Sequence, residues 1–132
     1  MDIQRGRLID HIHLRTQHFK ESKAFYTAVL KVIGVPVVDG VDHFSADELW
    51  VDTGAAESRV HLAFQTASRE TVDAFYEAAL KHGGRDNGPP GERDYHPGYY
   101  AAFVLDPDGN NIEAVFHGPH TRSAPSVVFK PA

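Results

Sequence analysis

Residues 11–34 read HIHLRTQHFKESKAFYTAVLKVIG, and residues 61–84 read HLAFQTASRETVDAFYEAALKHGG. The two stretches align without a gap at an offset of fifty residues, and nine of their positions are identical. Such self-similarity indicates one structural module that has been duplicated within the chain. Because His11 and His61 open the two copies at the same position, the repeat also predicts that these histidines can converge on one site across a pseudo-two-fold axis.

The composition is typical of a soluble globular protein. The chain has 132 residues, of which 42% are hydrophobic and 23% charged, and this suffices for one domain with a buried core. A net charge of −5 and scattered basic residues argue against a nucleic-acid partner. No apolar stretch approaches the roughly 20 residues of a membrane span. The N-terminus lacks the apolar segment of a secretory signal, so we expect a cytoplasmic protein with no membrane partner.

Two residue counts bear on the chemistry. Cysteine is absent, which excludes disulfides, thiolate metal ligands and cysteine nucleophiles. Histidine occurs nine times, a high number for this length, and this abundance is the compositional indication of metal chemistry.

The hydropathy pattern predicts the same order of elements in each copy: a strand, a helix and about three further strands. Apolar and polar residues alternate over 8–16 and 59–66, as in a half-buried strand. Apolar residues recur at helical spacing over 21–30 and 68–81. Further strands are predicted within 35–53 and over 99–106 and 111–117, the last two joined by a DPDGN turn at 106–110.

These elements predict a single domain over residues 1–132, with a first module at about 8–53, a second at about 59–117 and a tail at 118–132. One such module leaves a sheet face uncovered, whereas two modules bury their helix-facing sides and curve their other faces around a shared cleft. We therefore predict an α+β fold in which two tandem βαβββ modules form curved, partly open, barrel-like mixed sheets around a cleft.

The order of elements and several short stretches resemble the vicinal-oxygen-chelate superfamily. These stretches are DHIHLRT and SKAFYTAVL in the first module and VHLAFQT and FVLDPDGNNIEAV in the second. The superfamily includes glyoxalase I, the bleomycin-resistance proteins, the fosfomycin-resistance thiol transferases and the extradiol dioxygenases. The resemblance implies a metal-dependent enzyme of the lyase or dioxygenase type, whose small-molecule substrate has two neighbouring oxygens that chelate a divalent metal.

The resemblance also implies a metal site built from His11, His61 and Glu113. In the superfamily the ligands are a histidine on the first strand of each module and the carboxylate that follows the DPDG turn. Strand alternation agrees, since all three residues lie opposite the apolar positions of their strands. The glyoxalase pattern has a fourth ligand where this chain carries Trp50, so we expect a triad of two histidines and one carboxylate, which suits Mn(II), Fe(II), Ni(II) or Zn(II).

Other residues are candidates for the rest of the site. His13 lies on the predicted cleft face and is a candidate substrate contact, as are Trp50 and Arg122. The loop ERDYHPGYY (92–100) leads into the strand beside the ligand strand and offers groups for proton transfer, although aromatic packing without a chemical role is the alternative. The candidates in this loop are His96, Tyr99 and Tyr100.

Two other functions fit the sequence. One is a metal-free, small-molecule-binding dimer like the bleomycin-resistance proteins. The other is a fosfomycin-type thiol transferase, although the loop 92–100 lacks the serine and lysine of a phosphonate site. The resemblance further implies a homodimer, because related small two-module chains commonly pair modules from different subunits. The metal triad can then be completed either within one chain or between two copies.

Overall fold

The computed structural model describes residues 3–7, 9–123 and 126–129. Leu8, at the predicted start of the first module, and part of the predicted tail lie outside the described residues. The elements are, in chain order, β1 (Ile3–Arg5), β2 (Ile12–Thr16), α1 (Phe19–Ile33), β3 (Val38–Asp39), β4 (His43–Ala46), β5 (Leu49–Thr53), β6 (His61–Gln65), α2 (Arg69–Lys81), β7 (Arg85–Asp86), β8 (Gly91–Glu92), β9 (Tyr100–Leu105), β10 (Asn111–Phe116) and β11 (Val127–Phe129). Among the described residues, no helix is both long enough and apolar enough to cross a bilayer.

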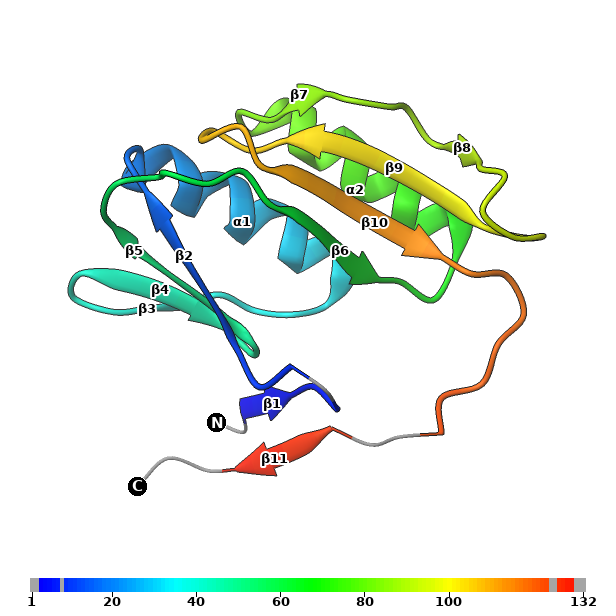
Figure 1. Cartoon of the computed structure of the whole chain (residues 1–132), viewed down its shortest axis with the longest axis horizontal. Helices are drawn as coiled ribbons and strands as arrows, with labels where there is room; N and C mark the ends of the chain where they lie inside the picture. The colour runs from blue at the N-terminus through cyan, green and yellow to red at the C-terminus, as the bar shows by residue number, and fades with distance from the viewer. Residues whose placement is uncertain (1–2, 8, 124–125, 130–132) are drawn as a thin grey trace.

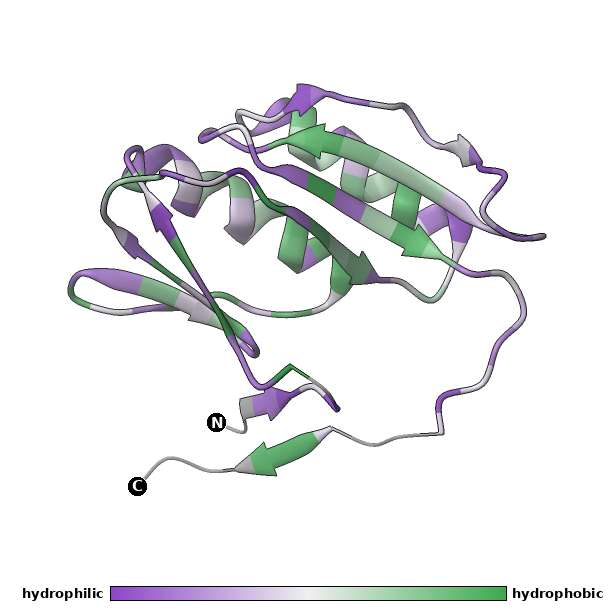
Figure 2. Cartoon of the chain, in the orientation of Figure 1, coloured by the Kyte–Doolittle hydropathy of each residue, from purple (hydrophilic) through white to green (hydrophobic). Residues whose placement is uncertain are grey.

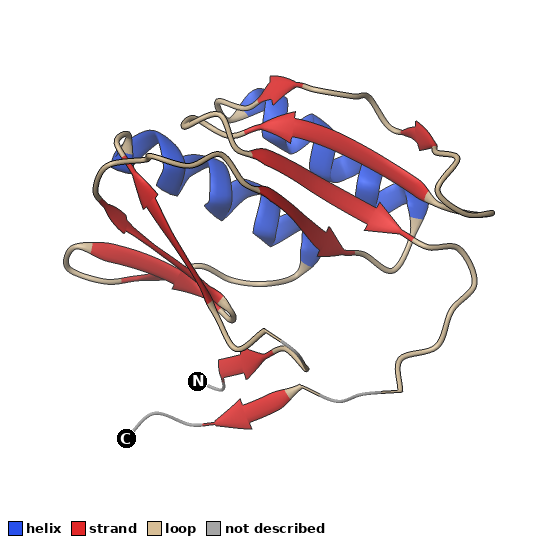
Figure 3. Ribbon diagram, viewed as in Figure 1, coloured by secondary structure: helices blue, strands red, loops and turns tan. Residues whose placement is uncertain are grey.

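Two open sheets and two helices make an α+β fold (Figure 1 and Figure 3). The first sheet has the strand order β2-β5-β4-β3, and the second has the order β6-β10-β9-β7, with β8 also paired to β9. Both sheets mix parallel and antiparallel pairs. The predicted α+β class with open, mixed sheets is therefore confirmed. A separate ribbon pairs β1 with β11, so the first and last described strands lie side by side (Figure 1).

The sequence repeat is visible in the strand register. β2 pairs in parallel with β5, and β6 pairs in parallel with β10. In these pairs His13 lies opposite Trp50, and Ala63 lies opposite Glu113. Because His13 and Ala63 occupy the same position of the fifty-residue repeat, Trp50 is the structural counterpart of Glu113. Both β2 and β6 lie at an edge of their sheets.

The helices bury one face of each sheet and leave the other face open. α2 packs on β9 and β10, whose hydrophobic residues are visible in Figure 2, and α1 packs on α2. In β2, Leu14 is buried whereas His13 and Arg15 on the opposite face are exposed. The main core joins both modules and contains Phe25 and Phe75, the equivalent phenylalanines of the repeat, both fully buried.

β2 is shorter than the strand predicted over 8–16 and begins at Ile12. The N–H of Ile12 donates to the carbonyl of Glu48 at 2.7 Å. On the partner side, the residue before Glu48 is Asp47, which forms the tight turn between β4 and β5 with a φ of 46°. Because the partner strand turns away at this point, the ladder ends there, and His11 lies just outside β2. Strand alternation therefore does not determine where the His11 side chain points.

The DPDGN turn at 106–110 joins β9 to β10 as predicted, and it is organised by a buried carboxylate. Asp106 Oδ1 accepts the backbone N–H groups of Asp108 at 2.9 Å and of Asn110 at 2.8 Å. The Asn110 side chain donates to Asp106 Oδ2 at 2.9 Å and accepts the N–H of Val60 at 3.0 Å. Asp106 is 2% exposed, so these bonds replace the water that its carboxylate loses.

The same turn links the second module to the first. The hydroxyl of Tyr26 in α1 donates to Asp106 Oδ2 at 2.5 Å. Asp108 accepts the backbone N–H of Gln17 at 3.0 Å and the hydroxyl of Ser22 at 3.3 Å. The hairpin of one module is thus fixed to the start of the helix of the other by buried hydrogen bonds to two carboxylates.

Replacing Tyr26 by Phe should lower the free energy of unfolding by about 1–3 kcal/mol, because the ring packing is kept while the buried carboxylate of Asp106 loses a donor. Tyr76 occupies the equivalent position of the repeat but is half-buried, which makes Tyr76→Phe the matched control. That control should change stability by less than about 0.5 kcal/mol. Urea denaturation measures both variants, and equal losses would contradict the role given to Tyr26.

The stability should also depend on pH through Tyr26. Burial, followed by the charge and hydrogen bond of Asp106, raises the pKa of Tyr26 well above its usual 10.0. The unfolded chain ionises this tyrosine near the usual value, so its contribution to stability is complete below that pH and is lost as the pH rises above it. Between about pH 10 and pH 12 we expect the unfolding free energy to fall more steeply in the wild type than in Tyr26→Phe. Parallel profiles from urea denaturation would refute this expectation.

Candidate functional site

The predicted ligands His61 and Glu113 lie side by side on the open face of the second sheet. His61 is the first residue of β6, and its Nε2 lies 2.7 Å from Oε1 of Glu113 in β10. The Glu113 side chain is 2% exposed, whereas that of His61 is 55% exposed. Because an ionised carboxylate only accepts hydrogen bonds, Nε2 of His61 donates to it. The pair therefore combines a buried carboxylate with an imidazole that a small molecule can reach.

Tyr99 completes the hydrogen bonding of this carboxylate. Its hydroxyl donates to Oε2 of Glu113, so each carboxylate oxygen has one donor. Burial and, next, the bond to Glu113 raise the pKa of Tyr99, which keeps the phenol protonated at neutral pH. A small apolar cluster on the same sheet contains Phe103 and Val115. The Phe103 ring lies 5.9 Å from the ring of His61.

Two histidines flank the ring of Tyr99. The rings of His96 and His117 each lie 5.3 Å from it at 81°, and they stack on each other at 5.2 Å. Nδ1 of His96 lies 2.9 Å from the Pro97 carbonyl, which only accepts, so this nitrogen carries the proton. Nε2 of His96 then accepts from Nδ1 of His117 at 2.9 Å. The two histidine rings therefore pack against the ring of Tyr99. This packing helps to hold the Tyr99 hydroxyl in place for its hydrogen bond to Glu113.

A second polar cluster lies on the open face of the first sheet and is centred on Asp52. Its Oδ1 lies 2.8 Å from Nε2 of His13 and 3.1 Å from Nε of Arg15. Trp50 lies two residues before Asp52 on the same face of β5. The bond from His13, with contributions from Arg15 and Trp50, lowers the pKa of Asp52 against the opposing effect of burial. The ring of Trp50 stacks on His43 at 3.8 Å and 12°.

The other predicted site residues lie apart from these clusters. His11 is 58% exposed, and its Nδ1 lies 2.7 Å from Asp10. Tyr100 lies on the helix-covered face of the second sheet, where its hydroxyl donates to Asp73 of α2 at 2.6 Å. Arg122 is exposed in the segment after β10, and in the described part of the chain no hydrogen bond or ion pair joins it to the Glu113 cluster.

Within the residues that the structure describes, no three histidine or carboxylate side chains of one chain are placed to hold a metal ion together. His61 and Glu113 supply two suitable donors, an imidazole nitrogen and a carboxylate oxygen. These donor types fit Mn(II), Fe(II), Ni(II) or Zn(II). One chain thus places together two donors of the kinds that divalent metals bind.

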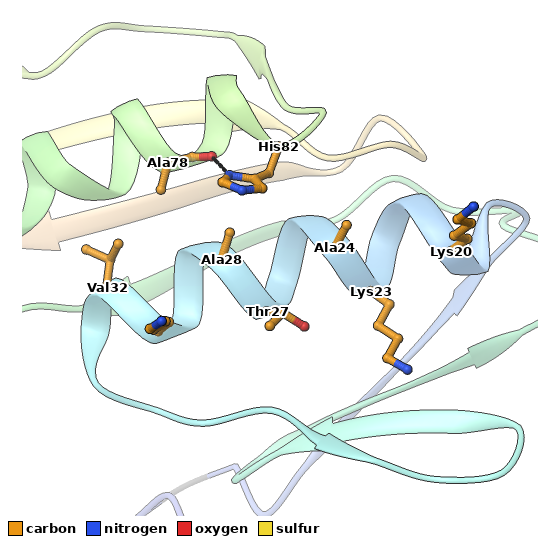
Figure 4. Close-up of a pocket in the computed structure, with 9 residues that line it drawn as sticks. Lys20, Lys23, Ala24, Thr27, Ala28, Val32, Ala78 and His82 are labelled. Carbon is orange, nitrogen blue, oxygen red and sulfur yellow. Dashed lines mark hydrogen bonds between the residues drawn. The ribbon is translucent and has the colours of Figure 1, made fainter.

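A groove of about 640 Å³ lies between α1 and the end of α2, away from both polar clusters (Figure 4). Its lining includes Ala24, Ala28 and Ala78, with lysines around them. His82 also lines the groove, with Nδ1 2.9 Å from the carbonyl of Ala78 (Figure 4). The groove contains no residue of the two clusters, so it has no part in the candidate site.

Sequence reasoning assigned no role to four residues of the two clusters, namely Arg15, Asp52, His43 and His117. Asp52 lies two residues after Trp50 on the same strand face, so strand alternation alone could have found it. His43 reaches Trp50 through the antiparallel register of β4 and β5, and His117 reaches Tyr99 across the end of the second sheet. Neither contact leaves a signal in the local sequence pattern.

Comparisons with known proteins identify the family. The sequence matches the Glyoxalase/Bleomycin resistance protein/Dioxygenase superfamily over residues 8–114. The chain therefore belongs to this superfamily, as its motifs indicated. A comparison with curated proteins gives no match.

Solved structures with the same fold include three of particular relevance. A glyoxalase/bleomycin resistance protein from Albidiferax ferrireducens is 31% identical, with 80% of this chain and 95% of that chain covered and a TM-score of 0.68. A glyoxalase-related enzyme from Fulvimarina pelagi is 21% identical, with coverage of 92% and 96% and a TM-score of 0.67. A genomically encoded fosfomycin resistance protein from Listeria monocytogenes is 20% identical, with coverage of 83% and 93% and a TM-score of 0.61. The last two establish the fold alone.

Replacing Tyr99 by Phe should lower the free energy of unfolding by about 1 kcal/mol, because the buried carboxylate of Glu113 loses one of its two donors. Tyr95 is the matched control, since its ring contacts Tyr99 but the side chain is 70% exposed. Tyr95→Phe should stay within about 0.5 kcal/mol of the wild type in urea denaturation. A Tyr99 variant as stable as the Tyr95 variant would show that the bond to Glu113 is immaterial.

Proposed function

We propose that the protein is a metal-dependent enzyme of the glyoxalase or dioxygenase type, acting on a small molecule with two neighbouring oxygens. The observation that carries this proposal is the pairing of His61 with the buried Glu113 on an open sheet face, with their donor atoms 2.7 Å apart. An imidazole nitrogen and a carboxylate oxygen are both ligands that divalent metals take in proteins.

His11 is proposed as the third ligand, supplied by a second copy of the chain. It is the repeat equivalent of His61, it is more than half exposed, and one chain does not group it with the other two ligands among the described residues. β2 and β6 are edge strands, and the backbone groups of an edge are available to pair with another chain. A two-fold dimer would therefore bring the first sheet of one copy to the second sheet of the other.

A divalent metal held by these residues would supply Lewis-acid activation of the substrate's neighbouring oxygens. The chain's own residues have separate tasks. As a ligand, His61 would offer Nε2 to the ion as a neutral imidazole, with its proton on Nδ1 instead. Tyr99 holds the carboxylate in place and keeps a proton on its hydroxyl, beside the position where a substrate oxygen would bind. His96 supports the Tyr99 ring from the side.

Elemental analysis of the full chain, purified without chelator, tests the proposal. About one divalent ion per chain is expected, because each dimer would contain two sites. His61→Ala and His11→Ala should each lose the ion, since either change removes one of three ligands. His82→Ala is the matched control, because His82 is an exposed histidine at the end of α2. Negligible metal in the wild type and all variants would overturn the proposal.

Mixing the two defective variants tests whether the site is shared. A dimer of one His11→Ala chain and one His61→Ala chain contains one intact site if the ligands come from different copies. After random reassembly, about a quarter of the sites should regain metal. No recovery in verified mixed dimers would show that the triad closes within one chain.

A metal-free, small-molecule-binding dimer is the second candidate function. It is favoured by the exposed indole of Trp50, which stacks on the half-buried ring of His43. A dimer without bound metal in the elemental analysis would support this function instead.

A further inference from the structure

The open face of the first sheet carries an aromatic shelf, formed by Trp50 of β5 and His43 of β4. The two rings are nearly parallel, at 12°, with their centroids 3.8 Å apart. The stack covers one side of the indole, yet Trp50 remains 38% exposed. A large aromatic side chain in this position offers a planar surface on which a second ring can stack.

Asp52 holds this shelf beside a guanidinium group. It hydrogen-bonds Nε2 of His13 and forms an ion pair with Arg15, and Trp50 lies two residues before it on the same strand face. The register places Arg15 directly opposite Asp52, one strand away and two residues along from the indole. On neighbouring strands, residues offset by two positions lie about 8 Å apart, given a rise of about 3.3 Å per residue and a strand spacing of about 4.8 Å. The shelf and the cation are therefore fixed relative to each other at a distance that one small molecule can span.

Arg15 keeps binding capacity after it has paired with Asp52. A guanidinium has five N–H donors, and the ion pair with Asp52 engages the Nε group. The Arg15 side chain is 54% exposed. Guanidinium groups bind carboxylates through two parallel hydrogen bonds, which gives them a preference for planar anions.

We propose that this face binds the substrate, and that the substrate is a planar aromatic carboxylate whose ring stacks on Trp50 and whose anionic group meets Arg15. The inference rests on the proposed function, since it names the substrate class of that site. Trp50 is the repeat counterpart of Glu113, so the shelf and the His61–Glu113 pair occupy equivalent positions on the open faces of the two sheets. The proposed dimer would bring these two faces together around one site.

Trp50 is the chain's single tryptophan, so its fluorescence reports on the shelf directly. Titration of the full-length protein with benzoate should change the Trp50 emission saturably. Cyclohexanecarboxylate, which has the charge without the aromatic ring, and benzyl alcohol, which has the ring without the charge, should each bind severalfold more weakly or not at all. A change that is linear in benzoate concentration, or equal for the three compounds, would overturn the proposal.

Arg15→Gln should weaken benzoate binding by about tenfold, because a charge-assisted, two-point contact is lost. Arg69→Gln is the matched control: Arg69 is also about half exposed and paired with one carboxylate, Glu92, but it lies on α2. The affinity of the Arg69→Gln variant for benzoate should equal that of the wild type. Circular dichroism checks that both variants are folded, and equal affinities of the two variants would refute the role of Arg15.

The metal content of the same preparation separates this inference from the proposed function. Saturable benzoate binding to protein that was purified without chelator and contains no metal would support the substrate-binding role of the shelf. The same result would contradict the proposal of a metal-dependent enzyme. Bound metal without saturable binding would contradict the shelf and leave the enzyme proposal standing.

Discussion

The buried carboxylate of Asp106 is the constraint on which the relation between the two modules depends. Its two oxygens accept from the turn that contains it and from the hydroxyl of Tyr26 in the other module. A buried carboxylate without such partners would be strongly destabilising, so the turn and the helix must meet at this point. This contact fixes β10, and therefore Glu113, relative to α1 and the first sheet.

Much of the fold could be predicted from the sequence because its signals are local. Strand alternation, helical spacing and the DPDGN turn each depend on neighbouring residues, and the repeat gave the same elements twice. Tyr26 shows where that reasoning stops. It matches Tyr76 in the repeat, and helical spacing assigns both to core packing. Tyr26 is nevertheless almost fully buried against Asp106, whereas Tyr76 is half-buried. The difference comes from a contact eighty residues away in the sequence.

The candidate site was predictable to a similar extent. Alternation and resemblance together named His61 and Glu113, which the structure places in contact. His11 was expected on a strand, but the ladder of β2 ends before it because the partner strand turns at Asp47. Tyr99 and Tyr100 are adjacent and equally aromatic, yet only Tyr99 reaches Glu113, since Tyr100 starts β9 on the helix-covered face. Which of two neighbouring residues faces the site depends on where the strand begins. The local sequence pattern does not fix that boundary to a single residue.

The two edge strands have a consequence for the behaviour of the protein at high concentration. Along one side of β2 and of β6, backbone N–H and C=O groups lack a neighbouring strand within their sheets. Such edges are templates for uncontrolled strand addition and hence for aggregation. Both strands are short, and His13, Arg15 and Gln65 interrupt them with polar side chains, which limits this hazard. Ordered pairing of two copies would cover the same edges, so the proposed dimer would also protect the chain from aggregation.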